Sequence, residues 1–173
     1  MSSTICQRRT PTFAEHRPAL QEALVNVSQE SFFAFAELCG IDRFGDALAA
    51  VEAQSEGAAK RWLRSRVDFD GAFAGTVELT LPHALATELL MSFTGLTPED
   101  GLTDVHVYDG IGEFANMVCG TWLTHACAHR RFDLQPPVVT AVAAPVTRAA
   151  DGQEELVLVN DQPVSLRVEF RAS

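Results

Sequence analysis

Hydrophobic residues recur with helical spacing over one long stretch, Thr103–Arg131. They form a stripe that we expect to be buried: Tyr108, Ile111, Ala115, Val118, Trp122 and Ala126. Because each helical residue turns by about 100°, a second line falls on the far side: Asp109, Gly112, Glu113, Asn116 and Gly120. The two glycines lie about one turn either side of Asn116, so we expect its carboxamide to project from nearly bare backbone. Such a strip is suited to entering another molecule's pocket, whereas the alternative is an ordinary solvated helix face.

The N-terminal part of the chain is less regular. Residues 1–15 are polar, and we expect them to be loosely ordered ahead of a single domain spanning 16–173. A helix is predicted from about Pro18 to Gly40, with an apolar stripe at Leu20, Leu24, Val27, Phe35 and Leu38. Residues 41–59 are rich in alanine and are predicted to form either a helix or an ordered loop.

From Arg61 the period changes to the alternation typical of strands. Residues 62–69 and 76–81 predict a hairpin that turns at Asp70-Gly71, and Pro82 to Gly95 predicts a helix. Residues 97–100 give a second helix-start signal. Four strands are predicted after the long helix, at 132–134, 138–142, 156–160 and 164–170. Helices grouped between strands favour an α+β fold. We expect a layered sandwich of about three main helices packed on a mostly antiparallel sheet of about five or six strands.

Composition narrows the class of function. The net charge of −10 and the pI near 4.8 argue against nucleic-acid binding, which requires clustered Lys and Arg. The four cysteines contain no C-x-x-C pair and predict reduced thiols in a cytoplasmic protein. No apolar run approaches the ~18 residues of a membrane span, and Met1–Arg9 lacks a signal-peptide core. We therefore expect a cytoplasmic protein with no membrane association.

Other chemistries have weaker support. His125 and His129 are four residues apart with Cys127 between them, which is compatible with a metal pair, but no third ligand lies near in sequence. We expect both histidines on the core side of the helix and predict no metal site. No G-x-S-x-G nucleophile elbow occurs, and the Gly110 to Gly112 pair lies inside a helix rather than after a strand, unlike a phosphate loop.

The order of Asp109, Glu113 and Asn116 resembles the D/S-x-x-x-E-x-x-N signature of the chemotaxis phosphatase family that contains CheX and CheC. The segment Glu113–Gly120 also resembles the family's glycine-flanked E-x-x-N helix. The predicted strand pair before it resembles the family's strand pair that leads into a helix. The resemblance covers about residues 61–173, and a single motif is closer to CheX than to CheC. In the family a proline follows the signature; here the candidates, Pro136 and Pro137, come a couple of residues early.

The resemblance implies an α/β sandwich with helices covering a curved sheet, and a phosphatase that acts on a phosphorylated CheY-type receiver domain of a response regulator. It implies that Asn116 orients the attacking water and that Glu113 meets the receiver's lysine, with Asp109, Gly112 and Gly120 in supporting or docking roles. The receiver would supply Mg²⁺, so the chain needs no cofactor of its own. A homodimer is expected by resemblance alone. The alternatives are a CheX-like module that binds a receiver or another signalling protein without hydrolysis, and an unrelated structural domain.

Overall fold

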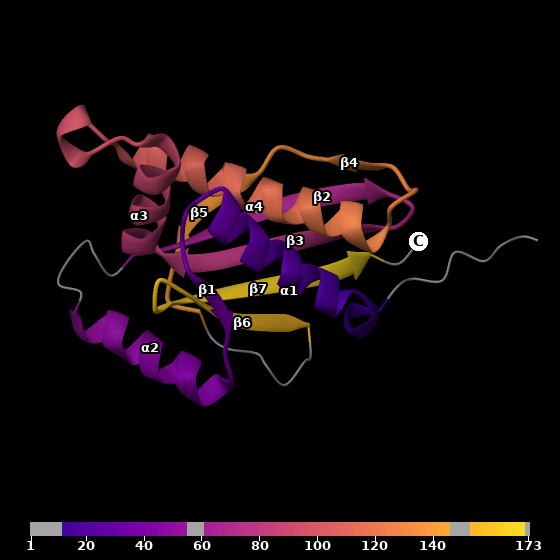
Figure 1. Ribbon diagram of the computed structural model, residues 1–173, viewed down its shortest axis with the longest axis horizontal. Coiled ribbons are helices and arrows are strands. Elements are labelled where there is room, and N and C mark those ends of the chain that lie inside the picture. Colours follow the sequence, from indigo (N-terminus) through magenta and orange to yellow (C-terminus); the bar gives the residue numbers. More distant parts are fainter. Residues whose placement is uncertain (1–11, 55–60, 146–152, 172–173) are drawn as a thin grey trace, which may run out of the picture.

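The computed structural model describes residues 12–54, 61–145 and 153–171, in which helices pack on an antiparallel sheet (Figure 1). In these ranges the sheet has seven strands, ordered β1-β6-β7-β3-β2-β4, and β5 also pairs with β2. The strands are β1 (Ala36–Leu38), β2 (Trp62–Gly71), β3 (Ala74–Pro82), β4 (Phe132–Leu134), β5 (Val138–Val142), β6 (Glu154–Val159) and β7 (Gln162–Arg171). The helices are α1 (Phe13–Glu30), α2 (Ile41–Gln54), α3 (His83–Thr94) and α4 (Asp104–Ala126), with a 3-10 turn at Pro98–Asp100. The predicted α+β sandwich is confirmed, with β1 as an additional edge strand.

Where local signals are strong, the predicted elements are confirmed. The β2–β3 hairpin pairs in continuous register from Trp62 opposite Pro82 to Phe69 opposite Gly75. Helix α3 follows Pro82 and ends at Gly95, whose φ of 71° is the left-handed conformation that glycine adopts at little cost. The segment left open as a helix or a loop is helical over Ile41–Gln54; its remainder, residues 55–60, lies outside the described ranges.

Helix α1 differs from the prediction at both ends. It begins at Phe13, because the Glu15 carboxylate accepts a hydrogen bond from the Thr12 backbone N–H at 2.8 Å and so caps the first turn. Residues 13–15 are therefore helical, while residues 1–11 lie outside the described part. The helix ends at Glu30 rather than near Gly40, since Phe32 turns inward and packs against the rings of Phe93 and Phe114. The chain then pairs as β1 with β6, which local sequence did not predict.

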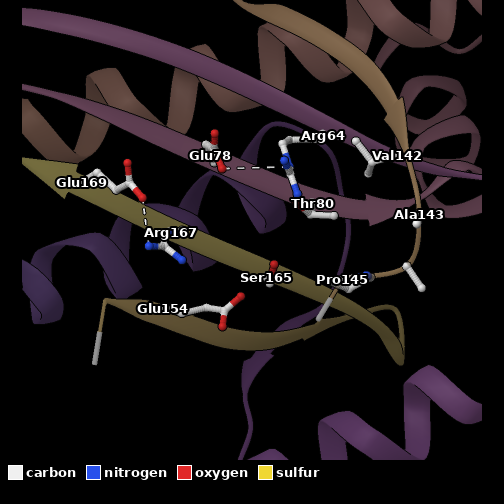
Figure 2. Close-up of a pocket in the computed structure, with 11 residues that line it drawn as sticks. Arg64, Glu78, Thr80, Val142, Ala143, Pro145, Glu154, Ser165, Arg167 and Glu169 are labelled. Carbon is white, nitrogen blue, oxygen red and sulfur yellow. Dashed lines mark ion pairs between the residues drawn. The ribbon is translucent and has the colours of Figure 1, made fainter. Parts of the chain in front are cut away.

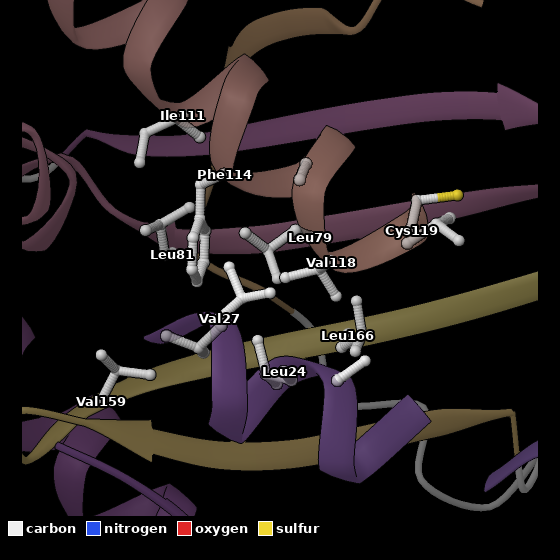
Figure 3. Close-up of a cluster of buried hydrophobic side chains, with 14 of the residues drawn as sticks. Leu24, Val27, Leu79, Leu81, Ile111, Phe114, Val118, Cys119, Val159 and Leu166 are labelled. Carbon is white, nitrogen blue, oxygen red and sulfur yellow. The ribbon is translucent and has the colours of Figure 1, made fainter. Parts of the chain in front are cut away.

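The core lies between the sheet and the pair of helices α1 and α4 (Figure 3). Leu24 and Val27 of α1 meet Phe114 and Val118 of α4, and strand residues such as Leu79 belong to the same cluster. On the other face of the sheet, charged residues alternate across four strands, with Arg66 opposite Glu78, Glu78 opposite Arg167 and Arg167 opposite Glu154. No helix in the described ranges is both long and apolar enough to cross a membrane.

Candidate active site

Helix α4 carries the candidate residues and is continuous from Asp104 to Ala126. It begins after Thr103 as predicted, and the backbone N–H of Thr103 donates to Nδ1 of His106 at 3.2 Å. It ends five residues before Arg131, because Phe132 has to pair with Gly71 at the end of β2. The central part of the predicted stripe is fully buried, at Ile111, Ala115, Val118 and Trp122, whereas Tyr108 and Ala126 are half-buried. The stripe fixes the rotation of α4 on the sheet.

The second line of α4 turns away from the core, as the helical spacing predicted. Asp109 and Glu113 are exposed, and Asn116 is half-buried. Among the residues the structure describes, none of these three side chains has a hydrogen bond or an ion pair. Glu113 and Asn116 are separated by about 4.5 Å along the helix axis, given a rise of about 1.5 Å per residue. A carboxylate and a carboxamide are thus presented together, with their polar atoms available to a partner.

The expectation of a bare strip around Asn116 is wrong at one end. A Cβ added to Gly112 would lie 3.0 Å from Cγ of Pro137, so this glycine is buried and allows the connection between β4 and β5 to approach the helix. A Cβ added to Gly120 would meet only Leu134 Cδ2, at 4.0 Å. Gly112 therefore allows the close approach of this connection to α4, whereas the contact at Gly120 is loose, and Asn116 lies between the two glycines on the helix.

The proline pair explains the shape of this edge. Strands β4 and β5 both pair with β2, but they are separated by Gln135, Pro136 and Pro137. Prolines have no N–H to donate to a sheet, so the edge strand breaks there after a last bond from Gln135 N to Asp68 O of 2.8 Å. The break brings Pro137 against Gly112.

A groove of about 390 Å³ lies beside the break, lined by Val105, Tyr108, Asp109, Gly112, Glu113, Pro137 and Val139. A second hollow, of about 340 Å³, lies at the other end of the line, next to Gly120 and between α4 and β4. Sequence reasoning missed the groove because Pro137 and Val139 come from a different element, and it placed Tyr108 in the buried stripe. A signal in the sequence is Val105, an apolar residue in the first turn of α4 that lies outside the predicted stripe and is exposed in the structure.

The histidine pair does not form the geometry considered for a metal. His125 and His129 are both exposed rather than on the core side, and α4 ends at Ala126, so the two no longer share a helix. Within the described ranges no group of three His, Cys, Asp or Glu side chains is arranged to hold a metal ion.

A larger cavity, of about 500 Å³, lies over the other face of the sheet (Figure 2). Its arginines are paired with neighbouring carboxylates: Arg64 with Glu78 at 3.9 Å and Arg167 with Glu169 at 2.9 Å. Because both of its arginines are already paired with neighbouring carboxylates, this cavity offers no group comparable to the carboxamide on α4.

Comparisons with known proteins agree with the fold. A family model described as "Chemotaxis phosphatase CheX" matches residues 64–159, and a search of curated proteins found no match. The CheX crystal structure from Vibrio vulnificus aligns at 17% identity over 94% of this chain and 100% of that chain, with a TM-score of 0.64. The CheX structure from Desulfovibrio desulfuricans aligns at 14% identity over 91% and 99% of the two chains, with a TM-score of 0.59. A CheC-like superfamily protein from a Shewanella species aligns at 18% identity over 91% and 98%, with a TM-score of 0.60. Since the family model spans more than half of the 173 residues and includes all of α4, the chain belongs to the chemotaxis phosphatase CheX family.

Proposed function

We propose that this protein hydrolyses the aspartyl phosphate of a CheY-type receiver domain, with Asn116 orienting the attacking water and Glu113 contacting the receiver's lysine. The observation that carries the proposal is the state of Asn116. Its carboxamide is half-buried on an unbroken helix, has no hydrogen bond in the described part of the chain, and lies one turn from the exposed Glu113. Its polar atoms are therefore available to a substrate brought by another molecule.

The chemistry requires little more than this from the phosphatase. An aspartyl phosphate is an activated acyl phosphate, and phosphoryl transfer depends mainly on positioning and on charge stabilisation. A carboxamide oxygen accepts a hydrogen bond from water, while its NH₂ group donates toward the phosphoryl oxygens. Asn116 combines both functions, so it can hold a water molecule in line with the phosphorus atom.

The remaining residues of the line support binding. The Glu113 carboxylate is exposed and unpaired in the described ranges, so it is free to form an ion pair with a lysine of the receiver. Asp109 lies one turn before it and adds a second negative charge on the same face. We expect Mg²⁺ to be bound by the receiver and to stabilise the phosphoryl charge there. A protein that acts on a receiver is expected in the cytoplasm. We also expect a homodimer, and analytical ultracentrifugation would test this.

The test is an assay of phosphorylated receivers from the same genome, loaded with acetyl phosphate or phosphoramidate. We expect the wild-type protein to accelerate phosphate loss from at least one receiver. Removing an oriented polar group from such a site costs about 3 kcal/mol of barrier, or about 10²-fold or more in rate. Asn116→Ala should therefore lose at least that factor.

Thr121→Ala is the matched control, because Thr121 is also a half-buried polar residue of α4 but lies outside the line that includes Asn116. We expect this control to keep the wild-type rate. If the wild-type protein binds receivers without accelerating phosphate loss, the protein is a docking module rather than a phosphatase. Equal rates for wild type and Asn116→Ala would exclude the catalytic role of Asn116.

A further inference from the structure

The groove beside Glu113 has a composition that the chemistry of Asn116 does not require. Its apolar part comes from two elements, with Val105 and Tyr108 on α4 and Pro137 and Val139 on the edge of the sheet. Its acidic part is Asp109 and Glu113. One groove of about 390 Å³ thus joins an apolar part to the carboxylates of the proposed site.

One apolar side chain of this groove is open to solvent. Val105 is 66% exposed, whereas Tyr108, Pro137 and Val139 are half-buried. Burial of this β-branched side chain by a partner would be favourable, because it would remove apolar surface from water. Exposed apolar groups bordered by charges are typical of surfaces that bind other proteins.

Gly112 gives the groove its floor. Because it has no Cβ, Pro137 approaches the helix backbone closely, and Val139 lies next to it, with its Cγ2 3.7 Å from the position a Cβ would take. A larger residue at 112 would push this connection outward. The groove is therefore built from contacts within the fold, with a shape that does not depend on the partner.

The charges indicate what kind of surface fits. Asp109 and Glu113 have no ion pair in the described part of the chain, and the whole protein carries a net charge of −10. A partner that places an apolar side chain in the groove would bring its neighbouring residues against these carboxylates. Unpaired carboxylates at an interface favour a lysine or an arginine there and disfavour an acidic residue.

We propose that the groove takes an apolar side chain of the receiver, a branched aliphatic or aromatic one flanked by a basic residue, and that Val105 thereby determines which receiver is bound. This inference rests on the proposed function, because it takes the receiver to be the partner. Glu113 lines the groove, and Asn116 lies one helical turn beyond it. The same docking event therefore fills the groove and brings the phosphoryl group to Asn116.

The test is Val105→Asp, with Ile41→Asp as its matched control. Ile41 is a β-branched aliphatic residue that is 53% exposed, and it begins α2, which packs near β6 and β7 rather than β4 and β5. Both substitutions place a carboxylate in the first turn of a helix, where the helix dipole favours it, so the two variants should fold equally well. They differ only in whether the new charge faces the proposed docking groove.

The readout separates binding from chemistry. A charge that docking would bury without a partner is unfavourable, so Val105→Asp should raise KM at least about tenfold. The effect should fall on KM, in contrast to Asn116→Ala, which should lower kcat. Ile41→Asp should leave KM unchanged. Equal KM values for Val105→Asp and Ile41→Asp would overturn the inference.

A binding measurement distinguishes failure of this inference from failure of the proposed function. Receivers loaded with Mg²⁺ and beryllium fluoride, a stable phosphoryl analogue, are titrated by calorimetry with the wild-type and variant proteins. One outcome is that no receiver loses its phosphate faster, but one receiver binds and Val105→Asp weakens that binding at least about tenfold. This result would support the docking groove and exclude the phosphatase activity. If no receiver binds the wild-type protein, both proposals are wrong.

Discussion

The two glycines that flank Asn116 should respond differently to the same substitution. Replacing a helical glycine by alanine is worth about 1 kcal/mol of helix propensity. In Gly120→Ala the new Cβ lies 4.0 Å from Leu134 Cδ2, which is an ordinary contact. We therefore expect the free energy of unfolding to rise by the full helix-propensity difference. In Gly112→Ala the new Cβ lies 3.0 Å from Cγ and 3.4 Å from Cβ of Pro137. The proline ring cannot rotate away, and overpacking of this kind costs about 1–3 kcal/mol. After the gain in helix propensity is subtracted, the free energy of unfolding should fall by up to about 2 kcal/mol.

Thermal unfolding followed by circular dichroism measures both variants. For a chain of this size, 1 kcal/mol corresponds to a shift in Tm of about 2–4 °C. Gly120→Ala should therefore raise Tm by about 2–4 °C, and Gly112→Ala should leave Tm unchanged or lower it by up to about 8 °C. Each variant is the control for the other, since both make the same change in the same helix. An equal rise in both would mean that Pro137 does not press on α4, and the packing account of the groove would be wrong.

Two further predictions concern stability. Burial lowers the pKa of His16, which lies among the rings of Phe73, Trp122 and Phe170, although the charge of Glu15 acts in the opposite direction. Protonation then favours the unfolded chain, so the free energy of unfolding should fall as the pH drops through the ordinary value of 6.5. Urea titrations at several pH values should show this loss, and His16→Phe should remove it; an unchanged slope in that variant would exclude His16 as the cause. The hydroxyl of Ser65 is buried with no hydrogen-bond partner in the described ranges, so Ser65→Ala should raise the free energy of unfolding by about 1 kcal/mol in urea. Ser28→Ala removes a buried hydroxyl that donates to Leu24 O at 2.8 Å, so its free energy of unfolding should rise less than that of Ser65→Ala. A larger rise for Ser28→Ala than for Ser65→Ala would show that the Ser65 hydroxyl is hydrogen-bonded.

The parts of the fold that the sequence predicted are those set by local chemistry. Thr103 caps the start of α4 and Gly95 ends α3 with a left-handed φ, because these choices depend on residues next to one another in the chain. The hairpin turns at residues 72–73, directly after the predicted Asp70-Gly71. The same holds for the rotation of α4. A periodic stripe fixes which face is buried, so the exposed position of Glu113 followed from spacing alone.

The parts that the sequence did not predict depend on contacts between distant segments. The predicted stripe of the first helix included Phe35, but this residue is 61% exposed, because the chain leaves the helix at Glu30 to pair β1 with β6. Tyr108 fits the buried stripe by period, yet it is half-buried at the groove. Gly112 was expected to be bare, but Pro137 covers it. In each case the deciding neighbour is more than 20 residues away, where periodicity carries no information.

The most direct test of the proposed phosphatase is the rate constant for phosphate loss from the receiver in a single turnover, with this protein in saturating excess. Under these conditions weaker docking no longer limits the rate, so the measurement isolates the chemical step. We predict that Asn116→Ala lowers this rate constant at least about 100-fold relative to wild type, while Thr121→Ala does not change it. A rate constant for Asn116→Ala within about threefold of wild type, a barrier change of less than 1 kcal/mol, would show that the carboxamide does not orient the attacking water.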